Sequence, residues 1–414
     1  MTDLKSAAPL DLHDERLIQR HGFGGALSSF MAQIRSGDLG SLPVAIGLVV
    51  IWGVFQTQNP YFLSSANLTN LIIECSAVGT MAIGVVLVLL VGQIDLSVGS
   101  MSGVASAILG VGLVHAGWSV WLAMGVALVA GVAVGAIYGV VFVRFGVPSF
   151  VITLAGLLAL LGLQLKILGT NGSINIPFDT FIVRFTQSMF LPELLSYGLV
   201  ALASAGYLAA RLARRRRRAR AGLSNKSIGG LLITAAVSFV VGEAVTWYLN
   251  QTRGISAAFV LFFSLVLITH LALTKSRWGR AIYAVGGSVE AARRAGIKVS
   301  LIFISVFTLC SAFAALGGLL AAGRLATASI SSGVGDTNLN AIAAAVIGGT
   351  SLFGGRGHAF SALLGILVIA SISNGLTLLS LDSSIRYMIT GAVLLVAVIV
   401  DALSRRSRAA HGTA

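Results

Sequence analysis

The sequence predicts an all-α protein that crosses a lipid bilayer many times, a polytopic transmembrane helical bundle. Of its 414 residues, 56% are hydrophobic and only 10% are charged, whereas a soluble domain carries roughly 25% charged residues. Apolar runs close to the membrane-spanning length of about 20 residues recur from Ser41 to Ala402. Both cysteines, Cys75 and Cys310, lie within such runs, which indicates neither a disulfide framework nor a metal site.

We expect about twelve spans, within a range of about ten to fourteen, with broken or re-entrant segments among them. They are placed at about Ser41–Thr57, Leu68–Val91, Leu96–His115, Trp118–Val143, Ser149–Leu168, Glu193–Ala210, Ile228–Leu249, Ser256–Thr274, Ser300–Ala322, Leu339–Gly354, Ala359–Leu379 and Ile385–Leu403. The tenth of these is short, so it either crosses or re-enters. The transmembrane domain thus covers residues 41–403, between cytoplasmic tails at 1–40, which has no signal-peptide core, and 404–414.

The basic clusters agree with an even number of spans, which places both termini on one side. By the positive-inside rule that side is the cytoplasm. It then holds a basic loop at 211–227 with Arg211–Arg220, and a second loop at 275–299. The loops around Asn59, Asn171, Asn250 and Asp336 fall outside. The net charge of +14 therefore reflects topology and contact with anionic lipid rather than nucleic acid.

The loop at 275–299 contains a short helix with all its end signals. Ser288 is a good N-cap, Glu290 faces the positive helix start, Arg293 and Arg294 face the negative end, and Gly296 can close the helix. A capped helix at the membrane surface favours docking to a partner. A solvated loop between spans is the alternative.

Two glycine-rich polar breaks interrupt the helical pattern, at Val91–Ser100 and Ile347–Gly357. Each lies between an apolar span and a span rich in small residues, and an internal repeat is one explanation. Paired interrupted segments often mark the substrate path of a transporter. The path residues predicted here are Gln93, Asp95, Ser97, Thr350 and Ser351.

The acidic residues within apolar runs have competing interpretations. An ionised group at the bilayer centre costs about 2.5–3.5 kcal/mol, so it usually faces a cavity or a partner. Asp95 is therefore a polar contact in the path, or it caps the helix that begins there, as Ser97 also could. Glu74 and Glu243 are interpreted as structural. Elsewhere, Gly125, Gly131, Gly135 and Gly139 lie along one span and predict close helix packing.

Motifs for catalysis and nucleotide binding are missing from the sequence. It contains no Walker A pattern, no H-E-x-x-H, no C-x-x-C and no G-x-S-x-G. Gly333–Asp336 spells the G-x-G-D of intramembrane aspartyl proteases, but Asp95 and Asp382 lack the flanking pattern expected of a second catalytic aspartate. We therefore expect no enzyme activity, no cofactor and no metal on this chain.

Three motifs, in order, resemble the permeases of bacterial ATP-driven (ABC) sugar importers of the ribose, xylose, arabinose and galactoside type. Ile94–Ser100 is similar to their I-D-L-S-V-G-S signature, and Tyr283–Ile297 to their coupling segment Y-A-x-G-G-N-x-x-A-A-R-x-(S/A)-G-I. The third match is Ala341–Leu352, followed by Gly354–Gly357. Shorter matches include Val147–Val151, and the resemblance extends from about Asn67 to Asp401. The insert at roughly Phe190–Leu249 resembles the longer xylose-type branch.

The resemblance implies a homodimeric permease in the bacterial inner membrane. Its partners are an ATPase subunit with two cassettes, which binds ATP and Mg²⁺, and a periplasmic sugar-binding protein. It implies import of a monosaccharide, D-xylose or a related pentose, by alternating access. The residues that it assigns to ATPase coupling are Gly286, Gly287, Ser288, Glu290, Ala291, Ala292, Arg293, Arg294 and Gly296.

The sequence departs from the family pattern at two positions. Ser288 stands where the family usually has Asn, and both residues cap helices. Asn338 stands where many members have Glu, which puts in doubt the role of an acid there and how this loop meets the binding protein. The alternative function is an ion-coupled secondary sugar transporter. It needs a buried ionisable pair, for which only Asp95, Glu74 and Glu243 could serve, and it leaves the coupling helix unexplained.

Overall fold

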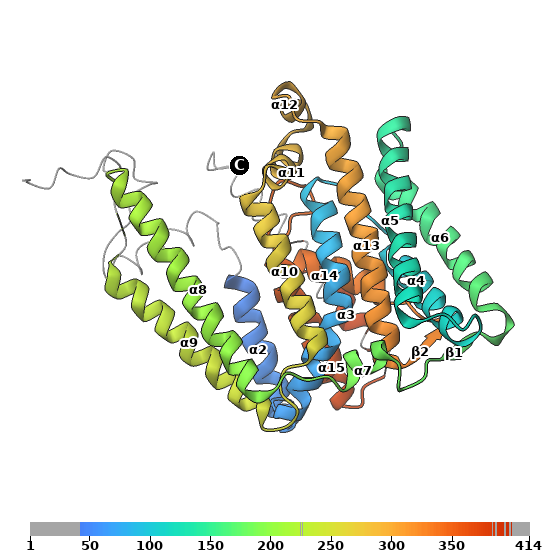
Figure 1. The fold of residues 1–414 in the computed structure, drawn as a ribbon, viewed down its shortest axis with the longest axis horizontal. Coiled ribbons are helices and arrows are strands. Elements are labelled where there is room, and N and C mark those ends of the chain that lie inside the picture. Colours follow the sequence, from blue (N-terminus) through green and yellow to red (C-terminus); the bar gives the residue numbers. More distant parts are fainter. Residues whose placement is uncertain are drawn as a thin grey trace, which may run out of the picture. The chain divides into compact units, whose positions relative to one another are not determined.

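The computed structural model describes residues 42–223, 225, 227–382, 384–385, 387–392, 395–396 and 399, and it is almost entirely helical (Figure 1). Eight described helices are long and apolar enough to cross a membrane, and three shorter apolar helices accompany them. The prediction of a polytopic helical bundle is therefore confirmed. Of the predicted span 385–403, nine of the 19 residues lie outside the described residues. The chain divides into two compact units, one containing Leu191–Ile255 and the other containing Gly40–Phe190 and Ser256–Leu403.

The larger unit contains most of the helices. They are α2 (Leu42–Gln58), α3 (Ser65–Leu90), α4 (Val98–Val114), α5 (Val120–Phe145), α6 (Ser149–Leu168), α7 (Phe181–Gln187), α10 (Ala257–Lys275), α11 (Arg277–Gly287), α12 (Val289–Arg294), α13 (Val299–Leu325), α14 (Thr337–Ile347) and α15 (Phe360–Leu378), with a 3₁₀ turn at Gly169–Asn171. Several helices begin at a serine, because its hydroxyl accepts a backbone N–H three residues further on. Ser64, Ser119 and Ser276 do this for α3, α5 and α11.

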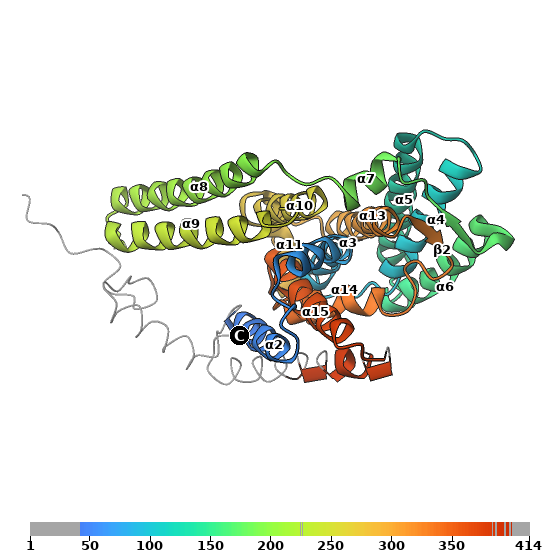
Figure 2. The ribbon, with the colours of Figure 1, turned by 90° about the horizontal axis from the view of Figure 1, so that it is seen from below.

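The buried centre of the larger unit is formed by α3 and α13, with α4 and α5 packed on α13. Seen from below, α3 lies among α10, α13, α14 and α15 (Figure 2). Gly131, Gly135 and Gly139 of α5 all lie against α13, and a Cβ atom at Gly131 would come within 2.7 Å of the Ser311 carbonyl oxygen. The predicted glycine packing is confirmed at these three positions, whereas Gly125 faces open space.

A small antiparallel sheet starts an extended segment that packs on α4. β1 (Ser173–Asn175) pairs with β2 (Thr327–Ser329), which directly follows α13. Within β2, Ala328 lies against Gly110 near the end of α4. The chain then follows α4 back to its first turn, where Gly333 contacts Gly99.

The segment that we predicted as the short span Leu339–Gly354 contains a helix of only half the membrane-spanning length. α14 has 11 residues and is therefore about 17 Å long, about half of a 30 Å hydrocarbon core. It begins beside the first break, where the Asn338 side chain donates to the Leu96 carbonyl oxygen at 2.7 Å. The segment around Asp336, which we predicted in an outside loop, packs against the start of α4. The sequence concealed this because extended backbone inside a bundle has no periodic pattern.

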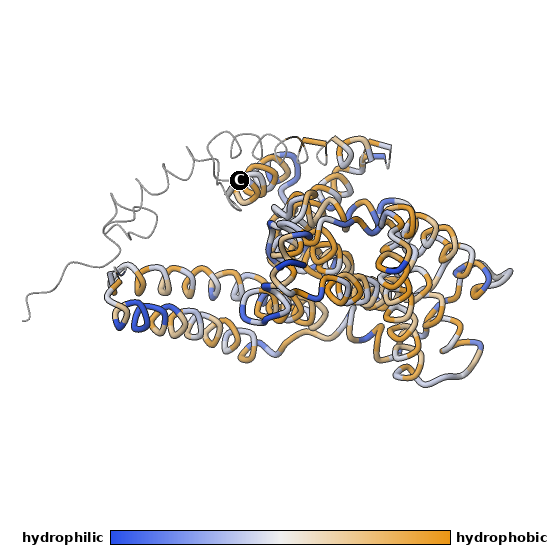
Figure 3. The backbone as a smooth tube through the Cα atoms, turned by 90° about the horizontal axis from the view of Figure 1, so that it is seen from above, coloured by the Kyte–Doolittle hydropathy of each residue, from blue (hydrophilic) through white to orange (hydrophobic). Residues whose placement is uncertain are grey.

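The smaller unit is a hairpin of two long helices, α8 (Glu193–Arg220) and α9 (Ile228–Asn250). They pack on each other, and Asn250 donates to the Ser196 hydroxyl at 3.1 Å. Arg211–Arg220, predicted as part of a loop at 211–227, instead forms the last turns of α8, because arginine is a good helix former. This stretch is the most hydrophilic part of the hairpin (Figure 3).

Candidate functional site

The first break, between α3 and α4, is held by side chains from two other helices. The Ile94 N–H donates to the Ser149 hydroxyl at 3.3 Å, and the Leu96 N–H donates to Thr153 at 3.1 Å, both on α6. Asn338 of α14 binds the Leu96 carbonyl oxygen. Backbone groups freed from a helix inside a membrane need such partners, since water is not available to them. The break is thus a fixed structure.

Asp95 is 1% exposed at the centre of this break. Its Oδ1 accepts two hydrogen bonds from Ser97, from the backbone N–H at 2.8 Å and from the hydroxyl at 2.7 Å. No described residue donates a hydrogen bond to its Oδ2 within hydrogen-bond distance and angle. The thiol of Cys310 lies beside the carboxyl group. One oxygen therefore organises the local chain while the other retains its acceptor capacity.

The contact with Cys310 locates Asp95 within the thickness of the bundle. α13 has 27 residues, and Cys310 lies about 17 Å from its start at a rise of about 1.5 Å per residue. Asp95 is therefore near the middle of the bundle rather than at its end. The cap interpretation changes as well. Ser97 occupies the N-cap position of α4 but makes no side-chain cap bond, so Asp95 supports the residue at the cap.

The second break follows α14 and folds on itself. The Thr350 N–H donates to Ala345 at 3.0 Å, and the Ser351 N–H donates to Arg356 at 3.0 Å, each bonding to a carbonyl oxygen. Thr350 is 1% exposed and Ser351 8%. The Thr350 hydroxyl makes no hydrogen bond with the described residues, and Gly357 packs on it. Like Asp95 Oδ2, this hydroxyl is a buried polar atom with unused capacity.

The two breaks meet each other and the end of α11 at one place, which we call the glycine junction: Leu90, Gly92, Gly286, Gly354 and Gly355. The Gly355 N–H donates to the Leu90 carbonyl oxygen at 2.8 Å. A Cβ atom at Gly286 would overlap that same oxygen and lie 2.6 Å from the Gly355 nitrogen, while one at Gly354 would lie 2.9 Å from the Gly92 nitrogen. Only residues without side chains allow three backbones to approach so closely.

A hydrogen bond beside the glycine junction ties α11 to the second break. The Tyr283 hydroxyl donates to the Gly357 carbonyl oxygen at 2.8 Å. Burial raises the pKa of Tyr283, so this hydroxyl remains a donor at neutral pH. α11 also buries Ile282 and Val285. The sequence pattern did not indicate this helix, which turns the loop at 275–299 into a packed element.

The short helix predicted at Ser288–Gly296 is present as α12. The Ser288 hydroxyl accepts from the Ala291 N–H at 3.2 Å, and Gly296 has the expected positive φ of 79°. Glu290 pairs with Arg293 at 3.5 Å and with Arg294 at 3.2 Å. These three charged side chains are exposed, while Ala292 is buried. α11 and α12 lie at one end of the larger unit, and α7 and the small sheet at the other (Figure 1).

The predicted path residues occupy the two breaks, but the breaks touch through the glycine junction rather than through these side chains. Gln93, near the start of the first break, is half-buried. Ser149, Thr153 and Asn338, which hold the first break, were not predicted as site residues. Ser149 had a signal because it lies in the short match at Val147–Val151, and Asn338 was marked as a departure from the family pattern. Outside the breaks, Glu74 forms an ion pair with Arg324 of α13, which supports its structural interpretation.

Comparison with known proteins places this arrangement in a family. The family described as "Branched-chain amino acid transport system / permease component" matches residues 67–398. The xylose transport system permease XylH of Escherichia coli K12 is 35% identical over 363 residues, 88% of this chain and 90% of that protein. XylH of Haemophilus influenzae is 31% identical over 381 residues, 91% of this chain and 100% of that protein.

The similarity extends to a second kind of sugar permease. The ribose import permease RbsC of E. coli K12 is 32% identical over 362 residues, 86% of this chain and 92% of that protein. No solved structure gives a significant match. The chain therefore belongs to this permease family, and the predicted permease subunit of an ATP-driven sugar importer is confirmed.

Proposed function

We propose that this chain carries D-xylose or a related pentose across the bacterial inner membrane from the periplasm to the cytoplasm. Two of the relatives are xylose transport permeases and one is a ribose import permease. A neutral sugar is held by hydrogen bonds and needs no fixed counter-charge. The unused polar atoms of Asp95 and Thr350 suit such a substrate, because buried polar groups gain free energy when they find partners.

The importer contains further subunits in this proposal. Two copies of this chain, with both termini in the cytoplasm, bind an ATPase subunit with two cassettes and receive sugar from a periplasmic binding protein. ATP and Mg²⁺ bind the ATPase, and no covalent step occurs on this chain. The exposed charges of α12, Glu290, Arg293 and Arg294, support a docking role. Family membership supports the partners as a class.

The observation that carries the mechanism is the glycine junction. α12 is joined to α11 by Ser288 alone, so a displacement of α12 by the ATPase is passed directly to α11. The end of α11 lies against both breaks with no side chain between the backbones at Gly286. Closure of the ATPase then moves both breaks together and switches the spans between outward and inward access.

The path itself runs along the breaks in this proposal. Gln93, Asp95 and Ser97 line it from the first break, and Thr350 and Ser351 from the second. The support is that four of these residues, Asp95, Ser97, Thr350 and Ser351, are buried, and that paired interrupted segments also occur in other transporters. Asp95 Oδ2 would accept a hydrogen bond from a sugar hydroxyl, while Oδ1 remains bound to Ser97.

The test is ATP hydrolysis by the purified permease with its candidate ATPase in lipid nanodiscs. The binding protein is added without sugar or loaded with D-xylose, D-ribose or L-arabinose. We expect hydrolysis to rise several-fold only with the xylose-loaded protein. Stimulation by another sugar alone would overturn the xylose assignment. A folded permease that forms no complex with the ATPase would overturn the coupling assignment.

The ion-coupled alternative is separated by uptake into proteoliposomes. It requires a buried ionisable pair, and the ion pair between Glu74 and Arg324 already uses one of its three candidate acids. Uptake that needs internal ATPase and ATP supports the importer. Uptake by the permease alone under a Na⁺ or H⁺ gradient would support the alternative.

A further inference from the structure

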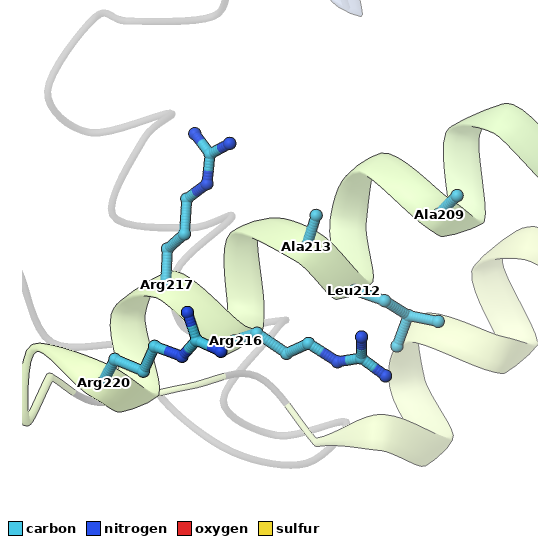
Figure 4. A pocket seen from close by; sticks show the side chains of 6 residues that line it. All are labelled: Ala209, Leu212, Ala213, Arg216, Arg217 and Arg220. Atoms are coloured by element: carbon cyan, nitrogen blue, oxygen red, sulfur yellow. The ribbon is translucent and has the colours of Figure 1, made fainter.

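We infer that the basic end of α8 holds an anionic phospholipid, with its phosphate on arginine side chains and an acyl chain on the preceding turn. A shallow depression lies there (Figure 4). It is lined by Ala209, Leu212, Ala213, Arg216, Arg217 and Arg220. Because successive members are one or three residues apart and alternate members are four apart, they form a single stripe along one face of the helix. The stripe is apolar at its start and cationic at its end.

The stripe changes from apolar to cationic at the depth where a phospholipid changes from acyl chain to phosphate. The apolar part of α8, Glu193–Ala210, is about 27 Å long at about 1.5 Å per residue, close to the hydrocarbon thickness of about 30 Å. Leu212 therefore lies near the hydrocarbon boundary. Arg216, Arg217 and Arg220 follow within about 12 Å of helix axis, in the headgroup layer. A phospholipid places its acyl chain and phosphate in the same order.

Charge complementarity selects an anionic headgroup. The last turns of α8 contain Arg211, Arg214, Arg215, Arg216, Arg217, Arg218 and Arg220. The acidic residues of the described hairpin are Glu193, at the opposite end of α8, and Glu243, within α9. Arg216, Arg217 and Arg220 are exposed. A planar guanidinium binds phosphate oxygens through two parallel hydrogen bonds, so three of them around one depression form a phosphate site.

The arginines that line the depression differ in surroundings from the other arginines of α8. Arg211 lies over the Tyr207 ring, with 5.0 Å between its guanidinium carbon and the ring centroid, and it does not line the depression. A diffuse attraction to the membrane would use every arginine alike. A site would use only Arg216, Arg217 and Arg220, and this difference makes the inference testable independently of the transport activity.

The experiment is native mass spectrometry of the detergent-solubilised full-length permease, titrated with dioleoyl phosphatidylglycerol or dioleoyl phosphatidylcholine. The test variant carries Arg216→Gln, Arg217→Gln and Arg220→Gln, and the matched control carries Arg214→Gln, Arg215→Gln and Arg218→Gln. At about 1 kcal/mol per arginine, three contacts correspond to about a hundredfold preference for phosphatidylglycerol. We expect the test variant to lose this preference and the control to keep most of it.

Three outcomes would overturn the inference. Equal affinity of the wild type for the two lipids would show that the depression does not recognise an anionic headgroup. Equal loss in both triple variants would show a diffuse charge effect without a site. Displacement of phosphatidylglycerol by millimolar inorganic phosphate would show that free phosphate, not lipid, is the ligand.

Discussion

The carboxyl group of Asp95 can be tested for its two roles separately, because each oxygen serves a different one. Asp95→Asn keeps an oxygen that accepts from Ser97 but replaces the unbonded Oδ2 by a donor. If Oδ2 binds a sugar hydroxyl, loss of that hydrogen bond costs about 0.5–1.5 kcal/mol, a fall of about 2-fold to 10-fold. We expect ATP-driven xylose uptake to fall by that factor.

The control for this variant is Asp95→Ala, which removes the bonds to Ser97 as well and should lower the temperature of thermal unfolding. The Asp95→Asn protein should unfold close to the wild-type temperature. Normal uptake by Asp95→Asn, together with impaired uptake by Asp95→Ala, would restrict Asp95 to a local structural role.

Gly286 and Gly287 provide a matched pair for the glycine junction. A methyl group at Gly286 would overlap the Leu90 carbonyl oxygen and crowd the Gly355 nitrogen, whereas nothing lies within 4 Å of one at Gly287. Both are helical positions, where alanine is favoured over glycine by about 1 kcal/mol. We expect Gly286→Ala to reduce the sugar transported per ATP hydrolysed, and Gly287→Ala, which meets no such contact, to reduce it less. Equal ratios in the two variants would contradict coupling through the junction.

Sequence reasoning found the residues of the two breaks but not what holds them in place. Asp95 and Ser97 were identifiable because polar residues beside glycine interrupt an apolar run. Thr153 and Asn338, which bond to the first break, carry no such mark, since their partners are backbone groups distant in sequence. Asn in place of the family's Glu at position 338 put in doubt the role of an acid there and how this loop meets the binding protein. The Asn338 amide donates to Leu96, a bond that an ionised glutamate could not make.

At the scale of elements, α12 is the surface whose role is easiest to isolate. Its charged side chains form exposed ion pairs, and such pairs contribute about 0–1 kcal/mol to stability. Substituting Glu290→Gln together with Arg293→Gln should therefore leave thermal unfolding almost unchanged. If α12 docks on the ATPase, the same change should uncouple ATP hydrolysis from xylose uptake.

The control for α12 is Arg144→Gln, an exposed cation in the last turn of α5 and outside the coupling segment. It should leave coupling intact. A folded Glu290→Gln, Arg293→Gln protein with normal coupling would contradict the docking role.

Elements with local signals were predicted well, and elements set by tertiary contacts were not. α12 carries its own cap, charges and closing glycine, so its bounds followed from the sequence. α14 lacks such signals, because its length is limited by the extended segment before it, which packs on α4 at Gly99. α8 continued past its apolar part because arginine costs little in a helix, although polarity had suggested a loop.

At the scale of the whole molecule, periodicity and composition were enough to predict the membrane bundle. They could not indicate that the breaks, separated by most of the chain, meet at α11. That contact depends on Leu90, Gly286 and Gly355 coming together from three distant segments. Each of the three sequence motifs contains or directly adjoins one of the three segments at this junction, which gives a physical reason for them to occur together.

The hairpin of α8 and α9 should be removable, because its two ends are already paired. The Leu191 N–H donates to the Ile255 carbonyl oxygen at 2.9 Å, and Phe190 bridges Ser256 in antiparallel fashion. An Asn-Gly turn closes such a pair with two residues. Deletion of 192–254 with this turn in its place should leave a folded permease that retains most of its ATP-driven xylose uptake.

The same deletion separates the lipid site from transport. The shortened permease should lose its preference for phosphatidylglycerol over phosphatidylcholine in native mass spectrometry while it still imports xylose. A full-length chain with Asn-Gly inserted after Leu191 controls for the linker and should keep both properties. If the shortened protein unfolds at the wild-type temperature but imports no sugar, the hairpin takes part in transport itself, and the path cannot be confined to the two breaks and the glycine junction.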